Sequence, residues 1–261
     1  MKILSIIQAM IASLIFFPTH EYTALPRDYG LISEDVRVVT EDGVKLAGWY
    51  LPAPEARGTV YLLHGNAGNI ADRLFKAEGW VKRGFSVFLL DYREYGKSEG
   101  QIKNEDDLYR DARAGLLWLR NEKKLSNSKI ILYGESIGTA PMIELATKEL
   151  FCVLILEAPF TSFVEVTKVH YPFVPVFLVN AFQFDNKSKI ESIDTPVFIL
   201  HGKDDEICPW KMGDALFQKV KAPKEFFSVP NGHHNDLPDV AGEDFYERPI
   251  QFLIKNQKGN L

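Results

Sequence analysis

The stretch Gly134-Glu135-Ser136-Ile137-Gly138 constrains the fold of this chain more than any other part of its sequence. It follows the apolar run 129–133, which has the composition of a buried strand, and it precedes a segment with the composition of a helix. Glycines two residues before and two residues after a serine allow a sharp turn that presents the hydroxyl group at the tip of a strand. The same five residues are also typical of a serine that caps a helix behind a glycine turn, so the stretch alone does not distinguish the two readings.

Apolar runs typical of strands alternate with helical patterns along the rest of the chain. The runs 59–63, 85–90 and 152–156 are apolar almost without interruption, which is typical of strands buried on both faces of a parallel sheet. This alternation predicts the α/β class, with a doubly wound, mostly parallel sheet that starts with an antiparallel hairpin at 36–51. Further strands are expected at 129–133, 195–200 and 225–229, and helices at 70–83, 105–123, 212–220 and 242–255.

Length and composition fit one domain. With 261 residues, 46% of them hydrophobic, the chain can bury a sizeable core, and we expect a single α/β domain over residues 19–261. Residues 158–190 form an irregular insertion after the sixth expected strand, and they hold six of the 18 phenylalanines. This enrichment predicts a short cap over the site. The cap is either an apolar wall that binds an acyl chain or a segment that only packs on the body.

The charge balance and the cysteine count exclude several classes of function. The chain carries 30 basic and 35 acidic residues, a formal net charge of −5, and no stripe dense in Lys or Arg, so we do not expect it to bind nucleic acid. Cys152 lies in an apolar run and Cys208 in an expected loop, which predicts two free thiols and no disulfide framework. Asp204, Asp205 and His234 are too loosely spaced for a metal signature, so the sequence predicts neither a metal nor a cofactor.

The first 18 residues form a separate apolar segment. Residues 3–17 are almost wholly apolar, their apolar positions recur at helical spacing, and Pro18 ends the run. The run is shorter than the roughly 20 residues that a membrane-spanning helix needs. We therefore expect an amphipathic helix over residues 1–18, with three alternatives: an anchor on a membrane surface, a helix packed on its own domain, or a cleaved signal. The first two predict a membrane-associated or a cytoplasmic protein.

Four of the expected strands end in polar residues that can take part in catalysis. In an open parallel sheet, active sites form where the loops leave the carboxyl ends of the strands. Ser136 follows one strand, His64-Gly65-Asn66 another, Asp204-Asp205 a third and His233-His234 the last. Nucleophile, acid and histidine follow one another along the chain in the order of an α/β-hydrolase triad. The sequence therefore predicts an enzyme that hydrolyses its substrate through a serine.

These residue types fit nucleophilic acyl transfer. A serine hydroxyl is a weak nucleophile at neutral pH, so an imidazole has to take its proton and a carboxylate has to orient the imidazole. The oxyanion of the intermediate needs N–H donors, which we expect from the backbone of Ile137, directly after Ser136, and of Asn66. His64 is expected to order the loop of Asn66 by hydrogen bonding. The partner of such a site is a small-molecule or acylated substrate.

Several short motifs of this chain occur together in one known family. They are Phe17-Pro18-Thr19, the run 64–69, the run 133–139 around Ser136, the run 201–206 and His234-Asn235-Asp236. With these motifs the chain resembles the α/β-hydrolase serine esterases, in particular the palmitoyl-protein thioesterases with an α/β-hydrolase domain and their membrane-anchored relatives. The resemblance runs from about residue 16 to the C-terminal helix. It implies the α/β-hydrolase fold, hydrolysis of esters or thioesters, and the triad Ser136, Asp205 and His234.

Rival residues and rival functions remain. Asp204 and His233 are adjacent to Asp205 and His234, and only the family spacing favours the second residue of each pair. Glu157 ends the strand before the insertion, where some hydrolases carry the acid. The alternative functions are an amidase or peptidase of the same fold, and a non-catalytic module that kept the pocket for binding.

Overall fold

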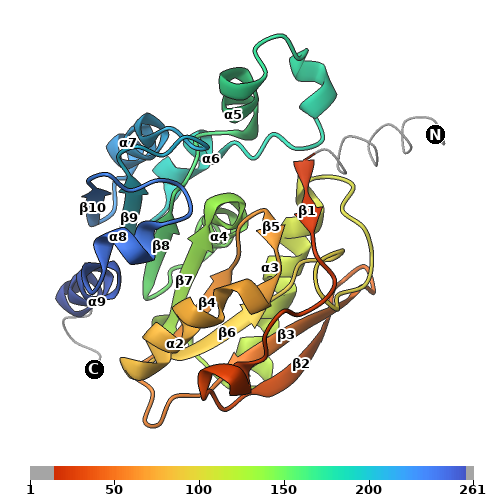
Figure 1. Ribbon diagram of the computed structural model, residues 1–261, viewed down its shortest axis with the longest axis vertical. Helices are drawn as coiled ribbons and strands as arrows, with labels where there is room; N and C mark the ends of the chain where they lie inside the picture. The colour runs from red at the N-terminus through yellow and green to blue at the C-terminus, as the bar shows by residue number, and fades with distance from the viewer. Residues whose placement is uncertain (1–14, 257–261) are drawn as a thin grey trace.

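Eight strands form one sheet through the centre of the protein (Figure 1). The computed structural model describes residues 15–256. The strands are β2 (Glu34–Val39), β3 (Lys45–Leu51), β4 (Thr59–Leu63), β6 (Ser86–Leu90), β7 (Ile130–Glu135), β8 (Val153–Glu157), β9 (Val197–Gly202) and β10 (Lys224–Val229). They lie in the order β10-β9-β8-β7-β4-β6-β3-β2. β3 runs antiparallel to its neighbours β2 and β6, and all other neighbours in the sheet are parallel.

Helices cover both faces of this sheet. They are α2 (Leu74–Lys82), α3 (Glu105–Asn121), α4 (Thr139–Ala146), α7 (Trp210–Lys219), α8 (Leu237–Ala241) and α9 (Asp244–Asn256). Side chains of α3, α4 and α7 join one buried apolar layer, and side chains of α2, α8 and α9 join the other. In α3, for example, Leu108, Ala112 and Leu116 recur every four residues on one side of the helix, and all three are buried. Single 3₁₀ turns lie at Pro26–Tyr29, Asn127–Lys129 and Ile190–Ser192.

The sheet and its two helical layers confirm the predicted α/β class with a mostly parallel sheet. Every residue of β4, β6 and β8 is buried, as expected of strands covered on both faces. The helix expected at 70–83 begins differently, as a 3₁₀ turn, η2 (Ile70–Arg73), that leads into α2. The turn starts there because the Asn69 side chain accepts a hydrogen bond from the backbone N–H of Ala71, at 2.9 Å.

A second, two-stranded sheet joins the N-terminal segment to the loop after β4. It pairs β1 (Phe17–Pro18) in parallel with β5 (Ala67–Gly68). The helix expected over residues 1–18 therefore ends before Phe17, because from there the chain is extended and hydrogen-bonded to that loop. The remainder of that prediction, residues 1–14, lies outside the described residues. No helix within residues 15–256 combines the length and the apolar character that crossing a bilayer requires.

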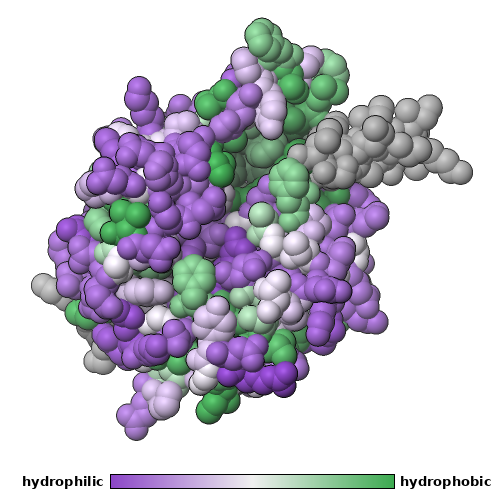
Figure 2. All heavy atoms as spheres, viewed as in Figure 1, coloured by the Kyte–Doolittle hydropathy of each residue, from purple (hydrophilic) through white to green (hydrophobic). Residues whose placement is uncertain are grey.

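The insertion of residues 158–190 follows β8 and stands over the carboxyl ends of the strands (Figure 1). Its elements are α5 (Phe163–His170), η5 (Val176–Val179) and α6 (Asn186–Lys189). Phe160 and Phe182 are buried, whereas Phe173 is 96% exposed and Phe177 is 69% exposed. Figure 2 shows apolar side chains gathered over this insertion. We call it the cap, since part of it packs on the body and part presents an apolar surface.

Candidate active site

Ser136 stands at the carboxyl end of β7, on a sharp turn into α4. Its φ is +52°, a left-handed conformation that costs energy in any residue with a side chain. Two glycines allow the turn to pack backbone against backbone. A Cβ atom at Gly134 would lie 2.5 Å from the carbonyl oxygen of Gly138, and one at Gly138 would lie 2.2 Å from the carbonyl oxygen of Leu63. The short turn η4 (Ser136–Gly138) thus holds the serine at the end of the strand, where the sequence predicted it.

His234 and Asp205 come together with Ser136 from the loops after β10 and β9. The Nε2 atom of His234 lies 3.0 Å from Ser136 Oγ, and its Nδ1 atom lies 2.8 Å from Asp205 Oδ2. Both side chains are largely buried, with Asp205 6% and His234 8% exposed. When the neutral ring donates a hydrogen bond from Nδ1–H to the carboxylate, Nε2 carries no proton and can accept the proton of the serine hydroxyl. The structure therefore links the three predicted residues in one hydrogen-bonded chain.

Donors hold both oxygens of Asp205. Oδ1 accepts the backbone N–H groups of Ile207, at 2.9 Å, and of Cys208, at 2.7 Å. Oδ2 lies 3.1 Å from His201 Nε2, in addition to its contact with His234. Burial acts to raise the pKa of Asp205, but the hydrogen bonds of His201 and His234 outweigh burial and hold this pKa well below its usual range. The carboxyl group is therefore ionised whenever the imidazole of His234 gains a proton.

The three rival residues are placed differently from Asp205 and His234. Asp204 is exposed, and so is His233, whose Nδ1 atom lies 3.3 Å from Glu206 Oε2. Glu157 is buried at the end of β8, where its two oxygens accept hydrogen bonds from Lys76 Nζ at 2.8 Å and 2.9 Å. Of the two acid candidates that are buried, only Asp205 contacts the histidine beside Ser136.

A buried network of charges lies next to the serine turn, and the sequence did not predict it. Glu135, the residue before Ser136, accepts hydrogen bonds from Arg73 Nη2 at 2.6 Å and from Lys76 Nζ at 2.7 Å. Burial acts to raise the pKa of Glu135, but the charges of Arg73 and Lys76 outweigh it and hold this pKa well below its usual range. Lys76 also binds Glu157. In the sequence this charge network is signalled only by Lys76, a charged residue within the apolar pattern of α2.

The loop after β4, residues 64–69, brings Asn66 to the same cavity as Ile137, so both expected oxyanion residues line one site. His64 is fully buried, and its Nδ1 atom lies 2.7 Å from the next carbonyl oxygen. Burial lowers the pKa of His64 to about 3, which leaves the ring neutral at neutral pH. Tyr95 Oη donates a hydrogen bond to the carbonyl oxygen of Asn66, at 2.6 Å. We call residues 64–69 the oxyanion loop, because they carry Asn66, one of the two residues expected to supply an oxyanion donor.

The chain is similar to known proteins along most of its length. Residues 54–183 match the family described as serine aminopeptidase, S33. An uncharacterised protein of Mycobacterium tuberculosis is 33% identical over 244 residues, which cover 93% of this chain and 86% of that protein. The human alpha/beta hydrolase domain-containing protein 17B is 34% identical over 220 residues, which cover 82% of this chain and 73% of that protein. The chain belongs to the α/β-hydrolase family.

Solved structures of α/β hydrolases share this fold. An esterase of Pyrococcus furiosus superposes with a TM-score of 0.78 at 22% identity, over 93% of this chain and 98% of that one. An α/β hydrolase of Vibrio vulnificus superposes with a TM-score of 0.77 at 19% identity, over 97% and 94%. At these identities the likeness shows the fold alone. The predicted α/β-hydrolase fold is confirmed, and membership of the family supports a hydrolase.

In this hydrolase Ser136 opens into a cavity of about 670 Å³ beneath the cap. The cap contributes Phe163 and Val166 to its walls, and the N-terminal segment contributes Ile15 and Phe17. Apolar side chains therefore face the serine from two sides. Burial raises the pKa of the Cys208 thiol, which also lines the cavity, so this group stays protonated and unreactive at neutral pH.

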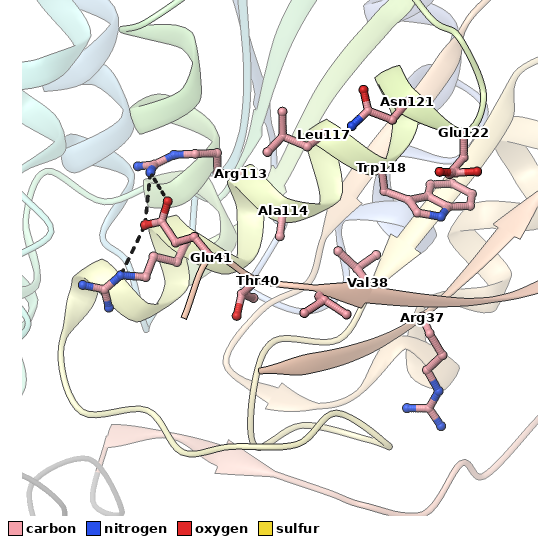
Figure 3. A pocket seen from close by; sticks show the side chains of 12 residues that line it. Arg37, Val38, Thr40, Glu41, Arg113, Ala114, Leu117, Trp118, Asn121 and Glu122 are labelled. Atoms are coloured by element: carbon pink, nitrogen blue, oxygen red, sulfur yellow. Dashed lines mark hydrogen bonds and ion pairs between the residues drawn. The ribbon is translucent and has the colours of Figure 1, made fainter. Parts of the chain in front are cut away.

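A second hollow, of about 320 Å³, lies between the edge strand β2 and helix α3 of the hydrolase (Figure 3). Arg113 and Arg110 pair there with Glu41, and Leu117 and Trp118 line the same hollow. The described residues around it include no serine, cysteine or histidine. Across residues 15–256, no three His, Cys, Asp or Glu side chains are grouped so that they could hold a metal ion. Of these two cavities, the larger one is the one that Ser136 lines.

Proposed function

We propose that the protein is a serine hydrolase of carboxylic esters or thioesters, with Ser136, His234 and Asp205 as its catalytic residues. The observation that carries the proposal is the hydrogen-bonded chain from Ser136 Oγ through His234 to Asp205, with contacts of 3.0 Å and 2.8 Å. These distances are within the reach that a general base and its orienting acid require. The positive φ of Ser136 and its place after a central strand support the same role.

The proposed reaction passes through an acyl-enzyme. Ser136 Oγ attacks the carbonyl carbon of the substrate while its proton passes to His234 Nε2, and the carbonyl oxygen becomes an oxyanion. The N–H groups of Ile137 and Asn66 stabilise the oxyanion, and the carboxylate of Asp205 stabilises the imidazolium. The intermediate collapses, and the proton on Nε2 passes to the leaving alcohol or thiol. Water then attacks the acyl carbon by the same route, which releases the carboxylic acid and restores the serine.

The cavity supports a lipophilic acyl chain as the group that is bound. Its volume of about 670 Å³ is in the range of small-molecule sites. Of the cap phenylalanines, Phe160 and Phe163 line the cavity, whereas Phe182 is fully buried elsewhere in the core. The phenylalanines of the cap thus support both interpretations of the sequence, an apolar wall for an acyl chain and packing of the cap on the body. Phe160 and Phe163 form the wall, and Phe182 holds the cap on the body.

A fluorophosphonate probe tests the proposed nucleophile. We expect the probe to label the wild-type protein and Ser192→Ala, because Ser192 lies in an exposed turn, and we expect no labelling of Ser136→Ala. Hydrolysis of nitrophenyl acetate should be lost with the label. Equal labelling of all three proteins would refute Ser136 as nucleophile. An unlabelled wild-type protein would instead support a binding module that kept the pocket.

Amide hydrolysis is a second candidate function, and the family description as a serine aminopeptidase favours it. The same triad can cleave esters, thioesters and amides, because the acyl-enzyme is common to all three. Wild-type protein should therefore be compared on a nitrophenyl ester, an acyl thioester and an aminoacyl nitroanilide. We expect the ester and the thioester to be cleaved faster. A higher kcat/KM on the nitroanilide would shift the proposal to a peptidase.

A further inference from the structure

Residues 15–21, which we call the N-terminal strap, run along the oxyanion loop. Strand β1 of the strap pairs in parallel with β5 of the loop. The pairing continues past the strand, since the backbone N–H of Thr19 donates to the carbonyl oxygen of Gly68, at 3.1 Å. The strap thus pairs with the loop that carries Asn66, although Ile15 and Asn66 are 51 residues apart in the sequence.

Asn69 ties the strap to the loop with a buried side chain. The residue is 1% exposed, and its Nδ2 atom lies 2.9 Å from Thr19 Oγ1 and 2.8 Å from the carbonyl oxygen of Glu21. Its Oδ1 atom accepts the backbone N–H of Ala71, at 2.9 Å, and so caps the turn that follows the loop. The Asn69 side chain therefore donates hydrogen bonds to the strap and accepts one from the turn that follows the loop.

Asn66 is held between the strap and the segment after β6. Its Nδ2 atom donates to the carbonyl oxygen of Ile15, at 2.5 Å, and its own carbonyl oxygen accepts Tyr95 Oη, at 2.6 Å. The backbone N–H of Gly96 donates to the carbonyl oxygen of Thr19, at 2.9 Å, so these two supports also bind each other. An oxyanion donor has to lie about 2.7–3.1 Å from the position that the oxyanion will take. Contacts that fix the backbone of Asn66 therefore fix a distance on which the rate depends.

We propose that the N-terminal strap is a positioning element of the oxyanion hole and that it acts through Asn69. The proposal rests on the proposed hydrolase function, since it assigns a task to residues around the same serine. Ile15 and Phe17 of the strap also line the cavity, so the strap supports the oxyanion donor and forms part of the acyl wall. A change that shifts the strap should then alter the reaction rate.

The variant Asn69→Ser removes the contacts to the strap and keeps the hydrogen bond that caps the turn Ile70–Arg73. Serine keeps an oxygen that can cap the turn, but it has no amide to donate to Thr19 and Glu21. Removal of a whole oxyanion donor costs about 10²- to 10³-fold in kcat, so we expect a shifted donor to cost about tenfold. The full-length protein is assayed on nitrophenyl acetate, per active site titrated with fluorophosphonate. KM should stay within about twofold, because the lost interaction belongs to the transition state.

A transition-state analogue supplies a readout that a loss of stability does not change. A trifluoromethyl ketone forms a tetrahedral adduct with the serine and places an oxyanion in the hole. Its inhibition constant should rise about tenfold in Asn69→Ser, in step with the fall in kcat/KM. A matched control is Asn127→Ser. Asn127 binds Arg120 at 3.0 Å and Glu149 at 2.9 Å near the start of β7, at the other end of the strand from the serine, and this variant should keep the wild-type kcat.

The following outcomes decide between the proposal and its alternatives. A wild-type kcat per active site in Asn69→Ser overturns it, and so does an equal loss in Asn127→Ser. If Asn69→Ser does not fold, Thr19→Val removes only the hydroxyl acceptor of the strap, and an unchanged kcat in that variant also overturns it. Activity that survives Ser136→Ala would refute the hydrolase function itself. A lost Ser136→Ala activity together with an unaffected Asn69→Ser would refute the strap alone.

Discussion

The floor of the active site, formed by Ser136, His234 and Asp205, and the cap above it are held by different kinds of contact. On the floor, His234 bridges Ser136 and Asp205 through polar atoms 3.0 Å and 2.8 Å apart. The cap faces the cavity with apolar side chains such as Phe163, and its outer residue Phe173 is 96% exposed. Hydrogen bonds weaken steeply when their geometry changes, whereas apolar contact varies smoothly with the buried area. The floor should therefore set the rate for every substrate, and the cap should set which acyl group is preferred.

The largest expected effect lies on the floor, at the acid. Asp205→Asn keeps the shape of the side chain but cannot hold His234 in the tautomer that leaves Nε2 free, so kcat should fall about 10⁴-fold on short and long esters alike. Steady-state kinetics on nitrophenyl esters measure this loss. Asp204→Asn, at the exposed neighbour, should keep wild-type kcat. A greater loss of kcat in Glu157→Gln than in Asp205→Asn would contradict the assignment of the acid.

The second expected effect concerns the contribution of the buried ion pairs beside the floor to the stability of the protein. Lys76 Nζ lies 2.7 Å from Glu135 Oε2 and 2.8 Å from Glu157 Oε1, and all three side chains are shielded from solvent. Lys76→Met would leave two buried carboxylates without this cation, so the free energy of unfolding should fall by about 3–5 kcal/mol. Urea unfolding followed by tryptophan fluorescence measures the difference.

The control for this variant lies on the same helix. Lys82 pairs with Glu78 at 2.8 Å, but its side chain is 65% exposed. Lys82→Met should therefore change the free energy of unfolding by no more than about 1 kcal/mol. Equal losses in the two lysine variants would mean that the buried network contributes no more than a surface pair.

Sequence patterns could predict the parts of this molecule that follow a period or a known order. The runs that became β4 and β8 are apolar almost without interruption, a pattern typical of burial on both faces. The choice between Asp204 and Asp205 could not come from the residues themselves, because both follow the same strand and only the path of the loop buries the second. The chemistry of the strand ends was thus predictable, and the identity of the acid needed the family spacing.

Two other features could not be assigned from the sequence. The strands β1 and β5 have two residues each, which is too short for any alternation, so the strap could not be recognised as a strand. The ion pairs of Lys76 join α2 to the ends of β7 and β8, and a pairing between distant elements depends on the finished fold. The pairing of these buried polar residues could therefore be identified only from the structure.

A third prediction tests the cap. Phe163 lines the cavity, so Phe163→Ala should lower kcat/KM on nitrophenyl octanoate about tenfold, because apolar area is lost from the acyl wall, and should leave nitrophenyl acetate within about twofold. Phe173→Ala, at the exposed outer residue of the same cap, should change neither value. Flat or falling activity of the wild-type protein from acetate to longer esters would contradict an acyl wall. A loss on acetate as large as that on octanoate would remove the distinction between cap and floor.

The smallest expected effect lies beneath the oxyanion loop and depends on pH. Asp91 Oδ2 accepts Tyr22 Oη at 2.6 Å, and Oδ1 accepts the backbone N–H of Ile70 at 2.9 Å. Burial raises the pKa of Asp91 to about 7, even though both hydrogen bonds act to lower it. The unfolded carboxyl group has a pKa of about 3.9, so between pH 4 and pH 7 the folded state keeps a proton that the unfolded state has lost. This group therefore makes the protein less stable as pH rises through that window.

Tyr22→Phe removes one of the two hydrogen bonds that stabilise the carboxylate, so the folded pKa of Asp91 should rise further from its ordinary value. The variant should then cost more stability at pH 8 than at pH 5, with a difference on the order of 1 kcal/mol, because one pKa unit corresponds to about 1.4 kcal/mol. Urea unfolding of wild type and variant at both pH values measures it. Tyr29→Phe, at a partly buried tyrosine packed on the same apolar layer, should have the same cost at both pH values. An equal cost of Tyr22→Phe at pH 5 and pH 8 would show that Tyr22 does not control the charge of Asp91 and that the support of the floor here is packing alone.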